Sequence, residues 1–393
     1  MKEGLSEREA RFVMQTYRRA DIDFVRGEGA LLYDDEGSEY LDFLSGISVT
    51  ALGHHNPELL EAAAAQAERL GHVSNLFFTE PMVDLAEVLS TGSIGGPVFF
   101  CNSGTEANEC AIKVVRKHAH QRGIVDPEII TFQGGFHGRT YGALSASPKM
   151  AGEAALGPML PGFRSVPFDD SEALRQAFDE RTAAVMLETI QGEAGVFPFS
   201  DETLATAREL TEEAGALLVI DEVQTGVGRT GSLWGFQQSP VRPDVITTAK
   251  ALGGGFPIGA CITSEGIGQV LSPGDHGSTF AAGPVAASVA LRVLELVDRP
   301  EMLRWIREAG QCLSDQLSGL SGVESVRGRG LMIGVALESG LDAGILQADL
   351  LKRGLVTNAP RPDTLRLLPP YTIDDEQIAR ACQTIAEALE AVK

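Results

Sequence analysis

Residues 217–224 read Leu-Leu-Val-Ile-Asp-Glu-Val-Gln, and residues 244–255 read Asp-Val-Ile-Thr-Thr-Ala-Lys-Ala-Leu-Gly-Gly-Gly. Each stretch holds a short apolar run of the kind that forms a buried strand. Asp221 follows the first run and Lys250 follows the second. Because open α/β sheets bind ligands at the carboxyl ends of their strands, we expect this carboxylate and this amine to face one site.

An aspartate and a lysine at such a site suit one cofactor. A lysine amine can form a Schiff base with an aldehyde cofactor, and an aspartate can pair with a pyridinium nitrogen. Lys250 and Asp221 together therefore predict binding of pyridoxal 5′-phosphate (PLP). Either residue alone is more simply a solvated surface charge, because most charged side chains are exposed.

Composition narrows the class of protein. The chain has 393 residues, enough for two or three domains, and its net charge of −22 argues against a nucleic-acid-binding surface. The five cysteines form no Cys-x-x-Cys pair, the first residues are charged, and no apolar stretch approaches the length of a membrane span. We expect a cytoplasmic protein with neither a nucleic-acid nor a membrane partner.

The middle of the chain predicts an α/β domain over residues 55–282. Helical patterns there alternate with apolar runs at 98–100, 129–132, 165–166, 184–187, 217–220, 245–246 and 260–262. This alternation predicts a mostly parallel sheet between helices. One of the helices, at 201–214, has Ser200 as its cap and Gly215 after it.

The two ends of the chain predict a second, smaller α+β domain. Residues 1–54 suggest a helix and a hairpin that turns at 34–37. Residues 283–393 suggest helices at 284–298, 301–320 and 374–391, with strands near 323–337 and 364–368.

Polar groups follow several of the predicted strands. Ser103, Gly104 and Thr105 stand between a strand and a helix, where free N–H groups can bind an anion, although plain helix capping explains them equally well. Phe136 could stack on a flat ring, and the nearby Arg139 could bind a carboxylate or simply be solvated.

Arg366 alternates with apolar residues in Thr-Leu-Arg-Leu-Leu, so it requires either a buried anion or a partly exposed edge strand. Glu193, in Gln-Gly-Glu-Ala-Gly, could neutralise it.

Two other patterns predict no chemistry. The letters of Gly226–Gly231 fit a dinucleotide fingerprint but precede a glycine-broken loop rather than a helix. The His54–His55 and His118–His120 clusters lack metal-ligand spacing, so we expect no metal.

Over nearly its whole length the chain resembles the class-III aminotransferases, which are PLP enzymes of fold type I. The matching motifs are Tyr40–Phe43, Leu52–Pro57, Ser74–Pro81, Phe100–Asn108, Phe136–Thr140, Gln191–Glu193, Asp221–Gly226, Ala249–Gly255, His276–Phe280 and Leu365–Pro370. So many ordered matches are specific for the superfamily and less so for the substrate. Within the family, the pattern is most similar to the branch that acts on N-acetylornithine.

The resemblance implies a role for each of these residues. Lys250 would bind PLP covalently and shuttle the proton, and Asp221 would keep the ring nitrogen protonated. The remaining cofactor contacts would come from Gln224 at the phenolic oxygen, from Ser103, Gly104 and Thr105 at the phosphate, from Phe136 and Val223 on the two ring faces, and from the adjacent His137. Thr279 would reach the phosphate bound in the other subunit of a homodimer.

The same resemblance implies a reaction. The terminal amine of N2-acetyl-L-ornithine would pass to 2-oxoglutarate, giving N-acetyl-L-glutamate 5-semialdehyde and L-glutamate, a step of arginine biosynthesis. Arg139 would bind the α-carboxylate of the amine donor and Arg366 that of 2-oxoglutarate. Glu193 would pair with Arg366 while the amine donor is bound.

Several alternatives stay open. The amine donor could be ornithine, succinylornithine, 4-aminobutyrate or a carrier-linked lysine intermediate, and the protein could be an aminomutase or a catalytically silent PLP-binding protein. Three departures from the common family pattern bear on substrate preference and loop geometry. Ala281-Ala282-Gly283 stands where many relatives have Gly-Gly-Asn, Ala194 replaces a common glycine, and Thr189 replaces a common proline.

Overall fold

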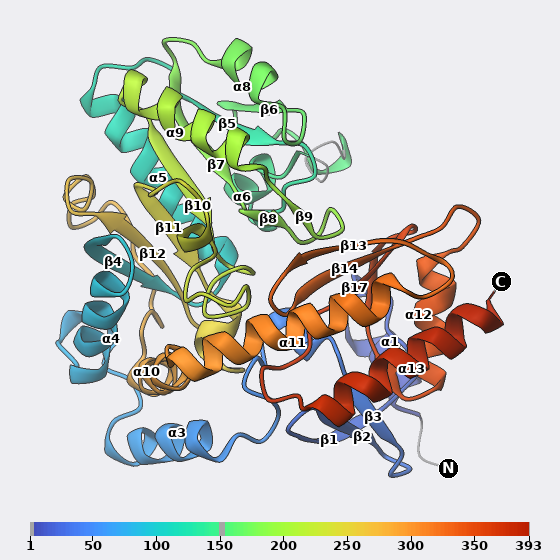
Figure 1. The fold of residues 1–393 in the computed structure, drawn as a ribbon. Coiled ribbons are helices and arrows are strands. Elements are labelled where there is room, and N and C mark those ends of the chain that lie inside the picture. Colours follow the sequence, from blue (N-terminus) through green and yellow to red (C-terminus); the bar gives the residue numbers. More distant parts are fainter. Residues whose placement is uncertain (1–3, 149–153, 393) are drawn as a thin grey trace.

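The computed structural model describes residues 4–148 and 154–392 (Figure 1). Its central sheet has the strand order β4-β12-β11-β10-β7-β5-β6. Strands β11, β10, β7, β5 and β6 pair in parallel, and β12 runs antiparallel to both β11 and β4. The predicted mostly parallel sheet is confirmed, with strands β4 Gly95–Cys101, β5 Glu128–Phe132, β6 Phe163–Val166, β7 Thr182–Leu187, β10 Leu217–Asp221, β11 Val245–Thr248 and β12 Gly259–Ser264.

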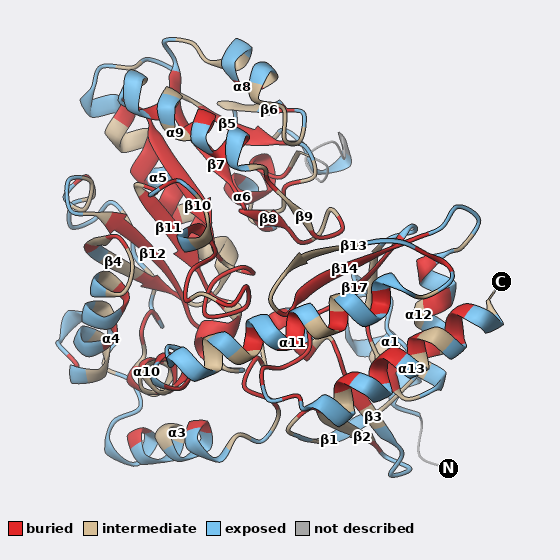
Figure 2. Cartoon of the chain, in the orientation of Figure 1, coloured by how far each residue is buried: buried red, intermediate tan, exposed pale blue. Residues whose placement is uncertain are grey.

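Helices cover both faces of this sheet, as the alternation of side chains along a strand requires. Leu217 and Val219 of β10 pack in one cluster with residues of α5, whereas Leu218 and Ile220 pack in another with Leu204 of α9. Figure 2 shows the central strands β7, β10 and β11 buried between these helices. The helices that precede or flank the sheet are α3 Pro57–Arg69, α4 Glu80–Thr91, α5 Gly104–Gln121, α6 Tyr141–Ser145, α8 Ser171–Ala177, α9 Asp201–Ala214 and α10 Pro284–Val297.

Helix α9 begins and ends where the sequence predicts. The Ser200 hydroxyl accepts a hydrogen bond from the Thr203 amide at 3.2 Å, and Gly215 ends the helix with a φ of +62°. A left-handed residue after the last turn is the common way to end a helix, and glycine adopts it without a steric cost.

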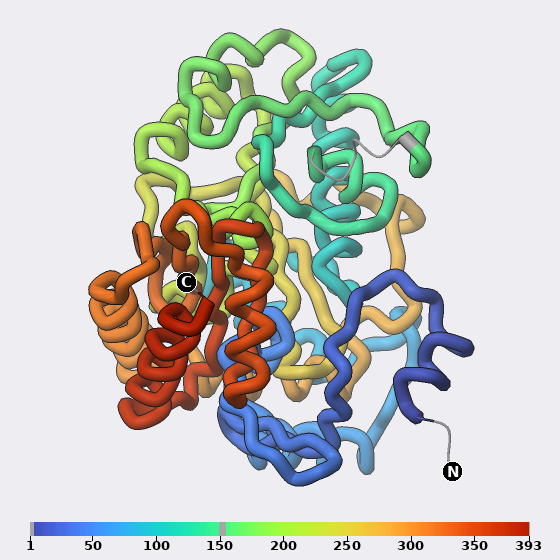
Figure 3. Tube along the Cα trace, turned by 90° about the vertical axis from the view of Figure 1, so that its right-hand side faces the viewer, coloured from blue at the N-terminus to red at the C-terminus, as the bar shows by residue number. Residues whose placement is uncertain are grey.

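The two ends of the chain meet in smaller sheets. Strand β15 near the C-terminus pairs in parallel with β3 near the N-terminus, with Leu355 opposite Leu41. A further sheet has the order β13-β14-β17-β16. Figure 3 shows both terminal regions gathered in the lower half of the molecule. These elements are α1 Leu5–Phe12, β1 Phe24–Glu28, β2 Leu31–Asp34, β3 Glu39–Asp42, α2 Ser45–Ser48, α11 Pro300–Ser318, β13 Val323–Arg329, β14 Met332–Leu337, α12 Ala343–Lys352, β15 Leu355–Val356, β16 Asn358–Arg361, β17 Thr364–Leu367 and α13 Asp375–Ala391.

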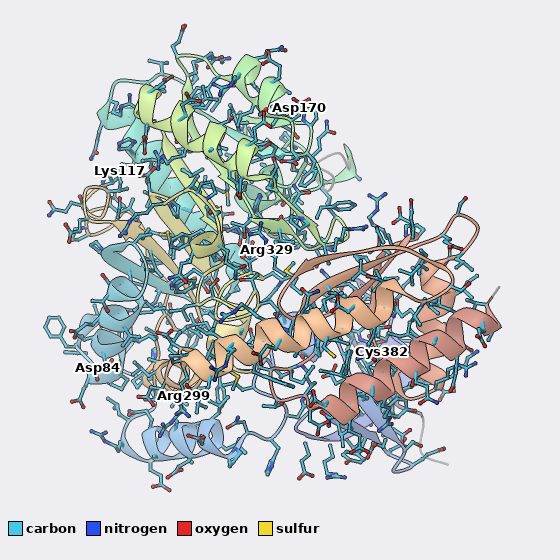
Figure 4. All side chains as sticks on the ribbon, viewed as in Figure 1. Asp84, Lys117, Asp170, Arg299, Arg329 and Cys382 are labelled. Atoms are coloured by element: carbon cyan, nitrogen blue, oxygen red, sulfur yellow. The ribbon has the colours of Figure 1, made fainter. Side chains whose placement is uncertain are left out.

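The described chain also contains a short hairpin and several 3-10 segments. Strands β8 Ile190–Gln191 and β9 Phe197–Pro198 pair antiparallel and carry the segment with Glu193. The 3-10 segments are η1 Ser74–Leu76, η2 Ala154–Leu156, η3 Gly235–Gln238 and η4 Lys250–Gly253. Arg329, labelled in Figure 4 at the meeting of the two regions, donates from Nη1 to the carbonyl oxygen of Gln238 at 3.4 Å. Among the described residues, no helix combines the length and apolar character needed to cross a membrane.

The glycine-rich stretch 226–231 opens no helix, in agreement with its rejection as a dinucleotide motif. Its turns instead place Arg229 in the core, fully buried. The Nε atom donates to the Ser48 hydroxyl at 2.8 Å, and Nη1 donates to the carbonyl oxygens of Leu331 at 2.9 Å and Pro369 at 2.6 Å. This guanidinium therefore links three segments that lie far apart in the sequence.

Substitution of Arg229 by methionine should destabilise the fold by about 3 kcal/mol or more, because two buried carbonyl oxygens lose their donor. The expected readout is a clear fall in the midpoint of thermal unfolding. Arg380→Met is the matched control, since Arg380 is partly exposed on α13 and pairs with Glu39. Its effect should stay within about 1 kcal/mol. Equal effects of the two substitutions would contradict this role for Arg229.

Candidate active site

A pocket of about 430 Å³ lies at the carboxyl ends of the central strands. Its position follows from strand register, because Asp221 at the end of β10 lies opposite Thr247 of β11, and Lys250 follows three residues later. Of the residues predicted from the sequence, the pocket is lined by Ser103, Gly104, Thr105, Phe136, His137, Arg139, Glu193, Asp221, Val223, Gln224 and Lys250.

Lys250 is half-buried in the pocket wall, and its backbone has a φ of +47°. This left-handed conformation costs a non-glycine residue of order 1 kcal/mol, and such strain concentrates at functional sites. Burial lowers the pKa of Lys250 from 10.5 to about 8, against the opposing charge of Glu193. The amine is therefore a better nucleophile near neutral pH than an exposed lysine.

Asp221 is held by three donors and is 3% exposed. Its Oδ2 accepts from Asn108 Nδ2 at 2.8 Å and lies 2.8 Å from His137 Nδ1, and its Oδ1 accepts from the Val223 amide at 3.0 Å. Burial disfavours a charged imidazole, but the hydrogen bond and charge of Asp221 raise the pKa of His137 above its usual value. The carboxylate is thereby fixed in one orientation at the base of the pocket.

The start of α5 forms one end of the pocket. The Ser103 carbonyl and hydroxyl oxygens accept from the amides of Ala107 and Glu106, which leaves the amides of Gly104 and Thr105 as the helix's unpaired first donors. Glycine at position 104 lets Val223 pack closely against the backbone, because an added Cβ would lie 2.6 Å from Val223 Cγ1. This end of the pocket is therefore built to receive an anion.

The hydroxyls at this end are engaged within the protein. Ser103 Oγ donates to Glu106 Oε2 at 2.7 Å, and Thr105 Oγ1 accepts from the Arg139 and Thr140 amides at 3.2 Å each. The structure thus shows the capping of α5, and this capping leaves the Gly104 and Thr105 amides available to an anion.

Arg366 lies behind the pocket wall and is fully buried. Its Nη1 donates to Glu193 Oε1 at 2.7 Å and to Gln224 Oε1 at 3.2 Å, and its Nε donates to Asn358 Oδ1 at 3.0 Å. Among the described residues its Nη2 has no partner. A buried guanidinium with a free nitrogen is a binding group for a second carboxylate oxygen.

Two predicted residues differ from the rest in their surroundings. Arg139 lines the pocket and is exposed, with its guanidinium carbon 5.9 Å from the centre of the Phe136 ring. Thr279 is exposed and is not among the described residues that line the pocket of its own chain. The structure thus brings together the predicted residues except Thr279.

Sequence reasoning missed several residues of the site. Glu188 lines the pocket, is 6% exposed and accepts from the Phe136 amide at 3.1 Å. Burial raises the pKa of Glu188 to about 7. Asn108 donates to Asp221 and accepts from Thr247 Oγ1 at 2.7 Å. Asn108 ends the Phe100–Asn108 motif, but nothing in that motif assigned it a role, and Glu188 had only its place just after a strand as a signal.

The two histidine clusters of the sequence make other contacts or lie on a helix. His54 Nε2 lies 2.7 Å from Oδ2 of the buried Asp42, and His118 is half-buried on α5. Among the residues that the structure describes, no group of three or more His, Cys, Asp and Glu side chains is placed to hold a metal ion.

Comparisons with known proteins agree with this geometry. Residues 13–389 match the family described as aminotransferase class-III. Two acetylornithine aminotransferases are similar over almost their entire lengths. That of Caldanaerobacter subterraneus is 42% identical, covering 98% of this chain and 99% of the relative, and that of Aquifex aeolicus is 43% identical, covering 96% and 100%.

Solved structures of aminotransferases superpose closely on the chain. The N-acetylornithine aminotransferase of Stenotrophomonas maltophilia aligns with a TM-score of 0.84 at 38% identity, covering 95% of this chain and 97% of that one. An ornithine aminotransferase of Toxoplasma gondii, whose active site partly contains PLP, aligns with a TM-score of 0.93 at 32% identity, covering 98% and 93%.

The lowered pKa of Lys250 can be tested by chemical labelling. A brief pulse of acetic anhydride on cofactor-free protein, read by peptide mass spectrometry, should modify Lys250 at a rate that rises with pH and levels off above about pH 8. Exposed Lys352 on α12 serves as the internal reference for reagent decay. A rate still rising steeply above pH 10, as for an ordinary lysine, would contradict the assignment.

Proposed function

Because this chain belongs to the class-III aminotransferases, we propose that it transfers the terminal amine of N2-acetyl-L-ornithine to 2-oxoglutarate. The products are N-acetyl-L-glutamate 5-semialdehyde and L-glutamate, a step that fits arginine biosynthesis. The chain is a PLP-dependent aminotransferase, and the acetylornithine enzymes at 42–43% identity support this donor. One structural observation carries the proposal: a buried Arg366 neutralised by Glu193 beside the pocket, with Arg139 exposed at the pocket wall.

The donor groups of the pocket fit PLP. Phe136 and Val223 are apolar walls for a ring, and the Gly104 and Thr105 amides suit its phosphate. The fixed carboxylate of Asp221 suits a protonated ring nitrogen, and Lys250 is the nucleophile for the aldehyde. When bound, PLP supplies an aldehyde that accepts amino groups and a ring that delocalises electrons.

The remaining chemistry is carried by the protein. Lys250, with a lowered pKa, can move a proton between the substrate carbon and the cofactor from inside the wall. Asp221, oriented by its bonds to Asn108 and His137, would pair with the ring nitrogen of the cofactor. Gln224, whose side-chain carbonyl accepts from Arg366, would bind the phenolic oxygen of the cofactor.

Two carboxylate sites explain how one pocket serves two substrates. Arg139 would bind the α-carboxylate of the amine donor, at the end far from its reacting amine. Arg366 would bind the α-carboxylate of 2-oxoglutarate in a forked pair, using the Nη2 atom that has no partner in the described structure. With the amine donor present, Glu193 neutralises Arg366; burial opposes its charge, but Arg366 lowers the pKa of Glu193 below its usual value.

We also propose a homodimer with shared active sites. Several large apolar side chains are exposed, among them Phe77 at 67%, Phe78 at 94% and Phe280 at 69%. Phe280 lines a second pocket that shares Asn102 and Phe256 with the first. A partner subunit would cover these groups and could supply its own Thr279. The cytoplasmic location stays a prediction.

The proposed division into domains has similar support. Residues 55–282 would form the large PLP-binding domain, and residues 1–54 and 283–393 would form the smaller one. The pairing of β15 with β3 supports this division, because it ties the two ends of the chain together.

A substrate panel tests the donor. Purified holoenzyme should transfer the amine of N-acetylornithine to 2-oxoglutarate with a higher kcat/KM than that of ornithine, succinylornithine, 4-aminobutyrate or a carrier-linked lysine. Lys250→Ala is the blank and should lose turnover while keeping its circular dichroism spectrum. If N-acetylornithine ranks among the poorest donors, the proposed substrate is wrong, and turnover of an amine without any keto acid would indicate an aminomutase.

The two-carboxylate scheme predicts that Arg366→Ala damages one half-reaction selectively. Single-turnover mixing should show the 2-oxoglutarate half slowed about 100-fold or more at low substrate, because a buried charged pair is lost. The amine half should change by less than about tenfold. Arg139→Ala should show the reverse pattern. Equal losses in both halves of either variant would argue against separate carboxylate sites.

A further inference from the structure

The segment that carries Glu193 belongs to the central region by chain connection but rests on the C-terminal sheet. Val196, fully buried, packs with Ile190 and with Met332 and Leu368 of that region. Its φ of +59° is unfavourable for a β-branched residue, so the surroundings must impose it. This hairpin segment, residues 192–197, is therefore held from outside rather than by its own hydrogen bonds alone.

The holding group is Arg327 of β13. Its Nε donates to the Gly195 carbonyl oxygen at 2.9 Å, and its Nη2 donates to the Thr364 hydroxyl at 2.9 Å. Its guanidinium carbon lies 3.9 Å from the centre of the Phe197 ring. The Arg327 guanidinium thus contacts the segment both at the Gly195 carbonyl and at the Phe197 ring.

The sheet register explains how the contacts of Arg327 are related to Arg366. Arg327 lies opposite Gly334 of β14, and Gly334 lies opposite Arg366 of β17. Residues opposite one another project from the same face of a sheet. The two arginines therefore flank Gly334 on one face, roughly 10 Å apart across two strand spacings.

The hairpin segment passes over that glycine. A Cβ on Gly334 would lie 2.8 Å from the Gly195 carbonyl oxygen, so only glycine leaves room for the backbone. One arginine of the row then binds the carbonyl of Gly195, and the other binds the carboxylate of Glu193 two residues earlier.

We propose that Arg327 is a positioning residue that holds Glu193 against Arg366 and so sets the balance between terminal-amine donors and dicarboxylate acceptors. This inference rests on the proposed function. A carboxylate ligand must displace Glu193 from Arg366. Because Arg327 holds the backbone at Gly195, Glu193 pairs with Arg366 again when the ligand leaves. Loss of the clamp lets Glu193 withdraw, which frees Arg366 for carboxylates and leaves it unneutralised when an amine donor is bound.

The test uses the PLP-loaded enzyme and glutarate, a dicarboxylate that cannot accept an amine. In Arg327→Gln, calorimetric titration should give a glutarate Kd about threefold or more below the wild-type value, while KM for N-acetylornithine should rise by a similar factor. These opposite shifts separate a positioning role from general damage, which weakens both. Arg327→Lys, which keeps the charge and a donor, should lie between wild type and Arg327→Gln.

Arg361→Gln is the matched control. Arg361 also approaches this segment, with its Cδ 3.1 Å from a Cβ placed on Gly195, but its guanidinium pairs with Asp363. The control removes the same charge without removing a bond to the segment, so both constants should stay near their wild-type values. If Arg361→Gln shifts glutarate binding as much as Arg327→Gln does, the effect is electrostatic and the proposal is wrong.

A double-mutant cycle tests whether Arg327 acts through Glu193. In a Glu193→Gln background, Arg327→Gln should leave the glutarate Kd unchanged, because no carboxylate remains to be held. A persistent shift would overturn the proposal, as would a parallel weakening of both ligands in the single variant. The glutarate titrations need no amine donor, so a failed substrate panel would refute the donor assignment and still leave the clamp to be judged.

Discussion

The parallel pairing of β10 with β11 is the constraint on which the site depends. It sets Asp221 opposite Thr247, and the chain then needs only three residues to bring Lys250 into the same pocket. Since side chains alternate along a strand, a shift of one residue would turn Asp221 to the other face of the sheet. The sheet's core packing enforces the register, because Leu218 and Ile220 must meet one helix layer while Leu217 and Val219 meet the other.

The pocket then concentrates buried charge in a protein that is acidic overall. Lys250, Asp221, Glu193 and Arg366 lie within one continuous arrangement, and each charge is met by an opposite charge or by fixed donors. Burial without partners would neutralise such groups, which is the direction that Glu188 and Lys250 show. The exception is Arg229, whose charge is met by carbonyl oxygens and a tyrosine ring rather than by a carboxylate. It stabilises the meeting of chain segments and lies outside the pocket.

The sequence predicted the elements whose signals are local. Apolar runs marked the central strands, and Ser200 with Gly215 marked both ends of α9. Gly226–Gly231 is followed by turns and bends rather than an α-helix, which is the local feature that excluded a dinucleotide motif. What escaped prediction depends on contacts between distant segments: the grip of Arg327 on Gly195 spans 132 residues, and the bond from Arg229 to Ser48 spans 181. No periodicity or cap signals such contacts.

The departures from the family pattern affect backbone conformation and packing. None of them replaces a residue predicted to bind the cofactor or a substrate. Thr189 is buried with a hydroxyl that has no partner in the described structure, beside Gly235. Ala282 has a φ of +45°, which costs alanine about 1 kcal/mol more than the glycine common there, just before α10. Ala194 has the most direct consequence, because it follows Glu193 in the gripped segment. An alanine there has fewer backbone conformations than glycine, so the segment loses less entropy when it is fixed. With the backbone restrained by Ala194, Val196 and Arg327, the proposed exchange of Glu193 for a substrate carboxylate at Arg366 would require only rotation of the glutamate side chain. The sheet and the cofactor pocket would stay in place.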